Sequence, residues 1–390
     1  MKTDSTPSVS AEPDATAPDA TATDSSSLLG SIALVAGTTI GAGILALPAA
    51  TLPAGLLPSS LLMIAVWLYM AASGFLIVEA TLHTRVQLGQ ADLGFLATVQ
   101  HLLGRWGAIA AGTVYIFIHY ALLIAYTARG GDIIASALTY VQQFLGFSQS
   151  AFPISQLISQ PVPLWCGHVA FSLLLGSLLF WKSERFVGRL NSILLAIIIF
   201  AFSGLLTATI PQITLPQLLR QQWSAASIAI PVMLVTFVYH SVVPVITTQL
   251  NGNRGNIRKA ILLGSLIPLS MFLLWNAAIL GSVNEETLQL AAENVFDPIE
   301  TLRMGSANPR LGLAISVFSE LAVVTSFIGF TYGLLSVFKD LFSIVTSPVT
   351  ATVTAPLTAK IQPQSTTTAP PFKLLSYALI FVPPLILSLV

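Results

Sequence analysis

Charged side chains are scarce in this chain. They make up 8% of its 390 residues, against about 25% in soluble domains, and its 16 basic and 16 acidic residues cancel. With 54% hydrophobic residues and a mean hydropathy of +0.82, this composition excludes a soluble globular domain and indicates an integral membrane protein. Zero net charge offers a polyanion no attraction, so nucleic acid is not expected as a partner.

Cysteine and the common catalytic motifs are also missing or nearly so. Cys166 is the single cysteine, which excludes an intrachain disulfide and a cysteine-rich metal site and is typical of a small packing residue. The five histidines lack metal-binding spacing, and no GxSxG, HExxH, paired-aspartate or nucleotide motif lies near a membrane face. GAGILA fits the GxGxxA fingerprint, but without the βαβ unit that the fingerprint requires. We therefore expect no enzyme, no metal and no cofactor other than a coupling ion.

Uncharged stretches of hydrocarbon length are abundant instead. About twenty apolar residues in a helix cross the ~30 Å apolar layer of a bilayer. Nine stretches meet this requirement, at 28–53, 59–80, 107–128, 162–181, 190–210, 224–248, 260–282, 311–338 and 372–390. Some should be kinked or interrupted by Pro211, Pro231, Pro244 and Pro268. The sequence therefore predicts an all-α polytopic membrane protein.

The basic residues of the connecting loops predict the orientation. If the N-terminus is inside, eleven lysines and arginines fall in inner loops, and the outer loops hold four, Arg129, Arg220, Arg303 and Arg310. Cytoplasmic loops carry the excess of positive charge. We therefore expect a multi-pass protein of the cell inner (plasma) membrane, surrounded by lipid, with a cytoplasmic N-terminus. Its oligomeric state is left open.

Low-complexity segments divide the chain into four parts. Residues 1–27 form a Ser/Thr/Ala/Pro tail that is expected to be disordered in the cytoplasm, and 339–371 form a cytoplasmic linker. The stretch 28–338 holds the first eight spans as a transmembrane core. The ninth span, 372–390, stops inside an apolar run, from which we expect the chain to be truncated at its C-terminal end.

The first span contains a composition that disfavours a continuous helix. Its centre, 37–43, reads GTTIGAG, with three glycines and two β-branched threonines. In lipid, freed backbone groups are tolerated only where they line a cavity or meet a ligand, so a broken helix here predicts a binding site. Two alternatives remain open: Gly37 and Gly41 form a GxxxG packing motif, and the helix could simply be kinked.

Three motifs carry a resemblance to a known family. They are GTTIGAGILALP, the segment IRKAILLGSLIPLSMFLLWNAAILG at 257–281 and TSFIGFTYGLLSVFKDLF at 325–342. Together they resemble the hydroxy/aromatic amino acid permease family, the tyrosine and tryptophan permeases, over about residue 28 to the end. The resemblance implies the amino acid–polyamine–organocation superfamily, a LeuT-like core of two inverted five-helix repeats, and proton-driven uptake of aromatic amino acids.

Under this resemblance, 224–248 is the second broken helix, with its break near 236–241 and before Pro244. Family members place a glycine beside the aromatic–His pair, where this chain has Val238, so the break should be costlier or the pocket narrower. Two five-helix repeats need ten helices and nine are predicted. We therefore expect the chain to need further spans before it can transport.

A transporter of zwitterions needs an anion site and an ammonium site. For the carboxylate, the sequence predicts backbone amides of Gly41, Ala42 and Gly43, assisted by the hydroxyl of Thr38 or Thr39. For the ammonium, it predicts unpaired carbonyls near Gly37 and at 236–239. Helix packing is the alternative role of these glycines.

An aromatic side-chain pocket is predicted from rings in the third and sixth spans, namely Tyr115, His119, Tyr120, Phe237 and Tyr239. Ordinary helix packing is the alternative for each of them. His240, near the second break, is a further candidate for contact with the substrate or a proton.

The coupling ion has two sets of candidate residues. Glu320 lies inside the eighth span, where a charge costs roughly 2.5–3.5 kcal/mol on insertion scales, so it could carry a proton or be a neutral packing residue. Thr325 and Ser326 could instead bind sodium together with carbonyls of the first helix. The residues leave proton and sodium open, and the resemblance favours the proton.

The function predicted from the sequence is import of aromatic amino acids (tyrosine or tryptophan) by a secondary active transporter, through proton symport and alternating access. The alternatives are a sodium-coupled amino acid symporter and a transporter-derived sensor or non-transporting fragment. Which amino acid is carried is not determined by the sequence.

Overall fold

The structure is a computed structural model that describes residues 20–41, 43–89, 93–144, 162–282, 309–346 and 370–389. Within these ranges the chain is helical apart from turns, short 3₁₀ segments and one isolated bridge between Gly55 and Gln221. The prediction of an all-α polytopic membrane protein is confirmed. In the described part, seven helices are long and apolar enough to cross a bilayer, and 27–40 and 373–388 are shorter apolar helices.

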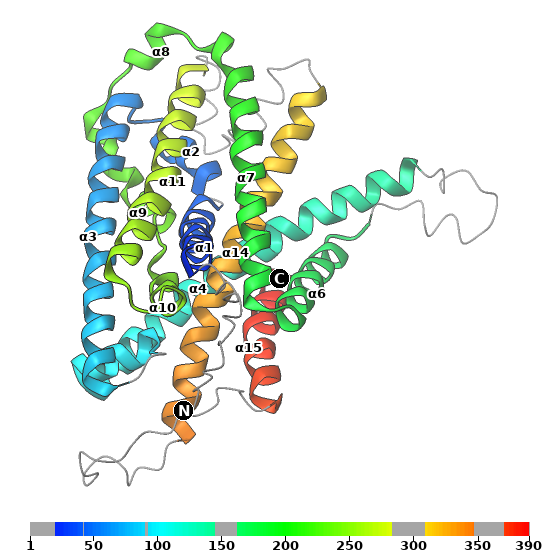
Figure 1. Ribbon diagram of the computed structural model, residues 1–390. Coiled ribbons are helices and arrows are strands. Elements are labelled where there is room, and N and C mark those ends of the chain that lie inside the picture. The colour runs from blue at the N-terminus through cyan, green and yellow to red at the C-terminus, as the bar shows by residue number, and fades with distance from the viewer. Residues whose placement is uncertain are drawn as a thin grey trace, which may run out of the picture.

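The helices form an upright bundle with one oblique member (Figure 1). The upright helices are α3 (Leu56–Leu88), α7 (Glu184–Thr209), α11 (Arg254–Ser282) and α14 (Pro309–Thr346). The helical segments on either side of the two chain interruptions lie among them. These are α1 (Ala20–Ile40), α2 (Gly43–Thr51), η3 (Trp223–Ala229), α9 (Ile230–Thr236), η4 (His240–Val242) and α10 (Val243–Gln249). Helices α6 (Leu164–Trp181) and α15 (Pro370–Ser388) pack against α4 to one side.

The oblique helix is α4 (Phe95–Phe144), which is much longer than the predicted span 107–128. Gly104 divides it, because φ 71° and ψ −175° fall in a region that only glycine adopts readily. The helix after Gly104 would be about 60 Å long at 1.5 Å per residue, so it must run at an angle to a ~30 Å apolar layer. Figure 1 shows α4 crossing the bundle and extending to the right.

The core surrounds α1 and α2, which pack against α7, α11 and α14. Its largest fully buried side chains include Trp275, Phe272 and Phe318, and Ile40 and Ile44 flank the point where α1 and α2 meet. An interrupted helix has backbone groups without helical partners, and exposing these groups to lipid would be costly. The interruption is tolerated here because protein surrounds it on all sides.

The boundaries of the end segments differ from the predicted ones. Helix α1 begins at Ala20, inside the predicted tail, and α14 continues to Thr346, past the start of the predicted linker at 339. The remaining residues of both low-complexity segments, 1–19 and 347–369, lie outside the described part of the chain.

The loop before η3 is tied to the end of α2. η2 (Ile210–Gln212) and α8 (Leu215–Leu219) lead into this loop. The Arg220 side chain donates to the carbonyl of Leu52, and the Gln222 amide donates to the carbonyl of Ala54 at 2.8 Å. Partial burial lowers the pKa of the Arg220 guanidinium. These bonds satisfy carbonyls beyond the last turn of α2.

Candidate functional site

The first interruption lies at the end of the GTTIGAG motif. Helix α1 ends at Ile40, Gly41 is in a turn, and α2 begins at Gly43, while Ala42 lies outside the described residues. The predicted break is confirmed here, but unwinding does not begin at Gly37. The hydroxyls of Thr38 and Thr39 donate to the carbonyls of Leu34 and Val35 at 2.6 and 2.8 Å. Such bonds to the preceding turn keep threonine compatible with a buried helix.

The second interruption is where the sequence predicted it. α9 ends at Thr236, residues 237–239 are not helical, and η4 and α10 follow. Pro231 and Pro244 stand in the first turns of α9 and α10, where no amide donor is needed. Among the described residues other than glycine, a positive φ is found at Asn251 alone. Val238 is therefore compatible with the break, and the expected extra cost has no conformational origin.

The two interruptions contact each other through glycine. A Cβ atom placed on Gly43 would collide with the Thr236 side chain, and one placed on Gly41 would lie 2.8 Å from the Tyr126 hydroxyl and collide with Ser326. α2 packs against α9 along this contact. Gly43 therefore lets α2 approach α9, and Gly41 lets the turn before α2 approach α14.

Gly37 also serves close packing. A Cβ placed there would lie 3.0 Å from the Asn191 amide nitrogen and 3.3 Å from the Thr325 Cβ. Gly37 and Gly41 thus lie one turn apart against α14, as the GxxxG alternative predicts. The Ser326 hydroxyl is within hydrogen-bond distance of the carbonyl oxygens of Gly37 and Thr38, at 2.8 and 3.1 Å. Ser326 therefore contacts carbonyls of the first helix, and the sodium site predicted from it stays a prediction.

Thr325, by contrast, hydrogen-bonds within its own helix. Its hydroxyl donates to the carbonyls of Leu321 and Ala322 at 3.0 and 3.1 Å. Asn191 on α7 donates its amide to the Ala33 carbonyl at 3.0 Å and leaves its carbonyl oxygen without a partner. The end of α1 is therefore held by polar side chains of α7 and α14.

A cavity of about 320 Å³ lies between the two interruptions. Its lining comes from the end of α1, the start of α2, the start and end of α9, and one face each of α4 and α14. The lining residues are Thr38, Thr39, Gly43, Ala46, Leu122, Tyr126, Pro231, Val232, Val235, Thr236 and Phe330. It is an apolar and aromatic space with three threonines and one helix start, a composition typical of small-molecule sites.

Three of the predicted substrate residues, Thr38, Thr39 and Gly43, line this cavity, and Gly41 lies beside it through Tyr126. Sequence reasoning missed Tyr126 and Phe330. Phe330 follows Ser326 by four residues, and helical spacing from that residue was a usable signal. For Tyr126, the only signal in the sequence was its position in the third predicted span.

Three of the predicted aromatic residues lie elsewhere. Tyr120 donates its hydroxyl to the Leu379 carbonyl on α15 at 2.8 Å, and Tyr239 donates to the Met70 carbonyl on α3 at 3.0 Å. Phe237 is fully buried and packs edge-on against Phe272, with ring centroids 5.3 Å apart. These rings anchor helices and do not line the cavity.

Tyr115 and His119 also lie outside the cavity lining. Their rings stack with centroids 3.8 Å apart, and the His119 ring meets Phe330 edge-on at 5.4 Å. At 1.5 Å per residue, His119 is about 10 Å along α4 from Tyr126. They form a separate layer next to the cavity.

His240 and Glu320 occupy different surroundings. His240 Nε2 lies 2.7 Å from the Ser73 hydroxyl and 3.2 Å from the Met70 carbonyl, so the ring is held against α3. Glu320 is partly buried on α14, near the charge of Arg129, and one of its carboxylate oxygens has no hydrogen-bond partner. Neither side chain lines the cavity.

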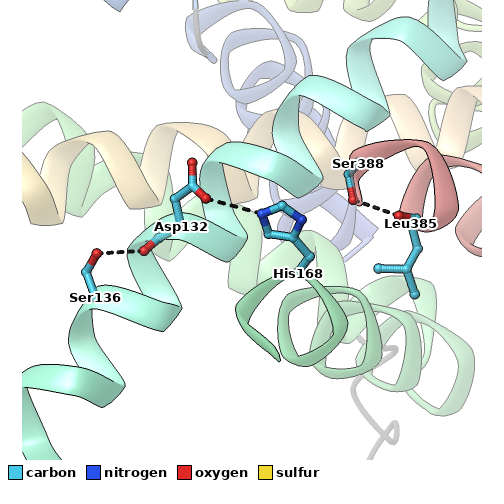
Figure 2. A network of polar contacts seen from close by, with 5 residues as sticks. All are labelled: Asp132, Ser136, His168, Leu385 and Ser388. Carbon is cyan, nitrogen blue, oxygen red and sulfur yellow. Dashed lines mark hydrogen bonds and ion pairs between the residues drawn. The ribbon is translucent and has the colours of Figure 1, made fainter. Parts of the chain in front are cut away.

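A polar contact away from the cavity joins α4 to α6, in the part of α4 that follows Tyr126. Figure 2 shows the His168 ring facing the Asp132 carboxylate, with Nε2 and Oδ1 3.2 Å apart. Asp132 also accepts the Ser136 hydroxyl at its backbone carbonyl at 2.8 Å. In the described part of the chain, no three His, Cys, Asp or Glu side chains come together as a metal site.

Comparison with known proteins gives consistent results. A sequence model described as the tryptophan/tyrosine permease family matches residues 24–390. A tryptophan-specific transport protein of Pseudomonas aeruginosa (strain UCBPP-PA14) is 29% identical, over 70% of this chain and 63% of its own length. Tyrosine-specific transport system 1 of Haemophilus influenzae is 27% identical, over 72% of this chain and 65% of its own.

Among solved structures, a manganese transporter of Eremococcus coleocola aligns with 96% of this chain and 73% of its own chain, at a TM-score of 0.49 and 15% identity. The chain spans somewhat under two thirds of the length of the two curated relatives.

Proposed function

Because this chain belongs to the tryptophan/tyrosine permease family, we propose that it takes part in the import of aromatic amino acids by secondary active transport. The observation that carries the proposal is the cavity between the two helix interruptions. About 300 Å³ is the lower end of the range for small-molecule sites, so a single amino acid is a suitable occupant.

The carboxylate of the substrate binds at the start of α2. Gly43 opens this helix and lines the cavity, and the first amides of a helix have no partner within it. Their dipoles attract an anion. Thr38 and Thr39 donate their hydroxyl protons to their own helix, so they can offer only lone pairs to the substrate.

The ammonium group binds near the end of α9. The Thr236 side chain lines the cavity directly beside Gly43 at the start of α2, and the last carbonyls of α9 lie at the same helix end. The Thr236 hydroxyl donates to the Val232 carbonyl at 2.7 Å and keeps its lone pairs for a donor. Opposite helix ends therefore meet the two charges of a zwitterion.

The side chain of the substrate packs on aromatic rings. Tyr126 and Phe330 line the cavity with ring centroids 5.8 Å apart, and Leu122 adds an aliphatic contact. An aromatic substrate gains both buried area and ring–ring contact there, and each such pair contributes about 0.5–1.5 kcal/mol. This favours aromatic over aliphatic amino acids.

We propose the proton as the coupling ion and alternating access as the mechanism, in which the half-helices beside each interruption pivot around the cavity. Sodium is the second candidate, because Ser326 meets the carbonyls of Gly37 and Thr38. Oxygen ligands of this kind suit a hard cation, as with calcium and magnesium.

The test is uptake of labelled tryptophan, tyrosine and phenylalanine by the 390-residue chain in liposomes. An inward proton gradient in sodium-free buffer should drive accumulation that saturates and is abolished by a protonophore. If accumulation requires sodium, the coupling ion is sodium and not the proton. Binding of tryptophan without any transport would support a sensor or a chain that needs further spans, and no binding of any aromatic amino acid would refute the proposal.

Phe330→Ala is the matched variant for the aromatic subsite. Its KM for tryptophan should rise about 5-fold or more, since truncating a buried aromatic contact costs about 1 kcal/mol or more. Phe381→Ala, which removes a ring outside the cavity lining, is the control.

A further inference from the structure

A buried polar cluster lies one layer away from the cavity, where α4, η4 and α14 meet at Gly333. A Cβ atom placed on Gly333 would lie 2.7 Å from the Tyr115 hydroxyl oxygen, 3.1 Å from His119 Nε2 and 2.7 Å from the Ser241 Cβ. Only a residue without a side chain fits at this point. The polar atoms of Tyr115 and His119 and the side chain of Ser241 therefore converge on the Gly333 backbone, and we call these four residues the Gly333 cluster.

The polar atoms of the Gly333 cluster are buried without hydrogen bonds. His119 is 2% exposed and Ser241 is 1% exposed. Tyr115 Oη, His119 Nε2 and Ser241 Oγ make no hydrogen bond of normal geometry, although the Tyr115 and Ser241 hydroxyls lie close enough to act on each other as a side-chain hydrogen-bond pair. Buried polar atoms are almost always paired, so the unpartnered His119 Nε2 in this cluster is a candidate binding atom.

The tautomer of His119 follows from its other ring nitrogen. Nδ1 lies 2.8 Å from the backbone carbonyl oxygen of Tyr115, which can only accept. Nδ1 therefore carries the hydrogen of the neutral ring, and Nε2 presents a lone pair to the cluster. The Tyr115 and Ser241 hydroxyls of the same cluster can donate a hydrogen bond to this lone pair or accept one from a protonated nitrogen.

We propose that the Gly333 cluster binds the coupling proton, with His119 Nε2 as the atom that takes it. This inference rests on the proposed transport function and assigns the proton a site that is separate from the cavity. The added proton forms the second N–H bond of an imidazolium, and this N–H donates a hydrogen bond to the hydroxyl oxygen of Tyr115 or Ser241. On release, the N–H electron pair returns to Nε2 and the neutral ring remains.

The Gly333 cluster lies next to both the substrate cavity and the second helix interruption, so a proton bound there can affect each of them. Phe330 lines the cavity with one side and meets the His119 ring edge-on with another. Ser241 lies in η4, directly after the second interruption. A protonated His119 on α4 can donate a hydrogen bond that the neutral ring cannot, and a Ser241 hydroxyl that turns to accept it ties η4 to α4, so protonation biases the same segment that borders the substrate.

The charged and titratable groups on the elements that pack against the Gly333 cluster make contacts outside it. Asp340 on α14 is the acidic group that acts on Tyr115, and it accepts the Ala97 amide at 3.0 Å. Lys339 is exposed, and His240 on η4 is turned towards Ser73 and Met70 on α3. Glu320 on α14 lies near Arg129. Glu320 is therefore the principal competitor for the proton and must be tested beside His119.

The test measures proton uptake on tryptophan binding to the purified 390-residue chain in weak buffer with a pH indicator. The wild-type protein should take up about one proton per tryptophan bound, because a site linked to binding exchanges protons with it. His119→Gln should bind tryptophan without proton uptake. Glu320→Gln and His83→Gln, an exposed histidine, should behave like the wild type.

Binding without proton uptake in the wild type, or unchanged uptake in His119→Gln, would overturn the inference. Loss of uptake in Glu320→Gln alone would move the proton to Glu320. If the wild type binds no tryptophan, the proposed function fails instead, and a second measurement still decides the site.

That second measurement is nitrogen NMR of ¹⁵N-histidine protein, which needs no substrate. The chain has five histidines, so the His119 signals can be assigned by substituting each of the others with glutamine. His119 should show the Nδ1-protonated tautomer at high pH and gain a second proton as the pH falls. Tyr115→Phe and Ser241→Ala should each make that protonation harder by removing an acceptor. A His119 ring that never gains the proton, or is indifferent to both hydroxyls, contradicts the proposal.

Discussion

At the scale of single residues, the glycines of GTTIGAG have separate packing roles. Gly37 admits Asn191 and Thr325, and Gly41 admits Ser326. Gly43 combines close packing with the start of α2. Glycine therefore allows close packing at all three positions, and Gly43 also lines the cavity in which we propose that the substrate binds.

Gly43→Ala should weaken both stability and tryptophan binding, because its Cβ would collide with the Thr236 side chain and separate the two interruptions. Overpacking of this kind costs about 1–3 kcal/mol. The measurements are thermal unfolding in detergent and tryptophan affinity.

Gly204→Ala on α7 is the control, because a Cβ there meets nothing within 4 Å. The double variant Gly43→Ala/Thr236→Ala should recover part of the stability, since it removes the two nearest colliding atoms, Cγ2 and Oγ1, and leaves only the Thr236 Cβ at 2.9 Å. A Gly43→Ala protein as stable as the wild type would show that the interruptions do not depend on this contact.

At the scale of secondary structure, interruption and continuity depend on where backbone groups find partners. Thr38 and Thr39 keep α1 helical by bonding to the preceding turn, and the helix stops only where glycine and Ala42 follow. In the second case Pro231 and Pro244 begin short helices on either side of the break. The non-helical residues between them are stabilised by buried rings, with Phe237 and Tyr239 held on α11 and α3.

Gly104→Ala tests the bend at the start of α4. Its φ of 71° and ψ of −175° lie in a region essentially restricted to glycine, and a Cβ there meets no neighbour within 4 Å. We expect a loss of about 1–3 kcal/mol in unfolding free energy from backbone strain alone. Gly188→Ala on α7 is the matched control, as it has open space and no positive φ.

Chemical denaturation followed by circular dichroism would measure both variants. Equal stability of Gly104→Ala and Gly188→Ala would mean that α4 can begin as a continuous helix, and the bend would then have no conformational origin at Gly104.

At the scale of the whole molecule, the surface between helices and lipid carries little information about chemistry. Helices such as α3 and α7 expose Leu68, Leu76 and Phe200, as a bilayer requires, and polar contacts gather inside. The interior connects three layers: the contacts of α1 with Asn191 and Ser326, the cavity, and the Gly333 cluster. A transporter would place ion, substrate and movement within one packed core.

The predicted orientation can be tested by cysteine labelling, since one substitution, Cys166→Ser, gives a cysteine-free background. The exposed residues Gln87 and Gln221 follow the second and fifth predicted spans. With a cytoplasmic N-terminus, Gln87→Cys should react only from the inside and Gln221→Cys only from the outside. The reverse labelling pattern would overturn the orientation, and labelling of both from one side would overturn the predicted number of spans.

The sequence by itself determined the membrane class, the position of most helices and the first interruption, and the family resemblance added the second. These features are local, because lipid requires a nearly unbroken apolar run and because glycine, threonine and proline act on their own backbone. The family resemblance also lay in short contiguous motifs and agrees with the family match over residues 24–390.

Only the tertiary structure decided which side chains face the cavity. The spans are apolar on every side, so periodicity does not distinguish the faces of α4, and Tyr126 lines the cavity while Tyr120 bonds to α15. The Gly333 cluster likewise depends on three elements that are distant in sequence and meet through packing. Helix rotation is set by close packing with neighbours, and that information is absent from any single span.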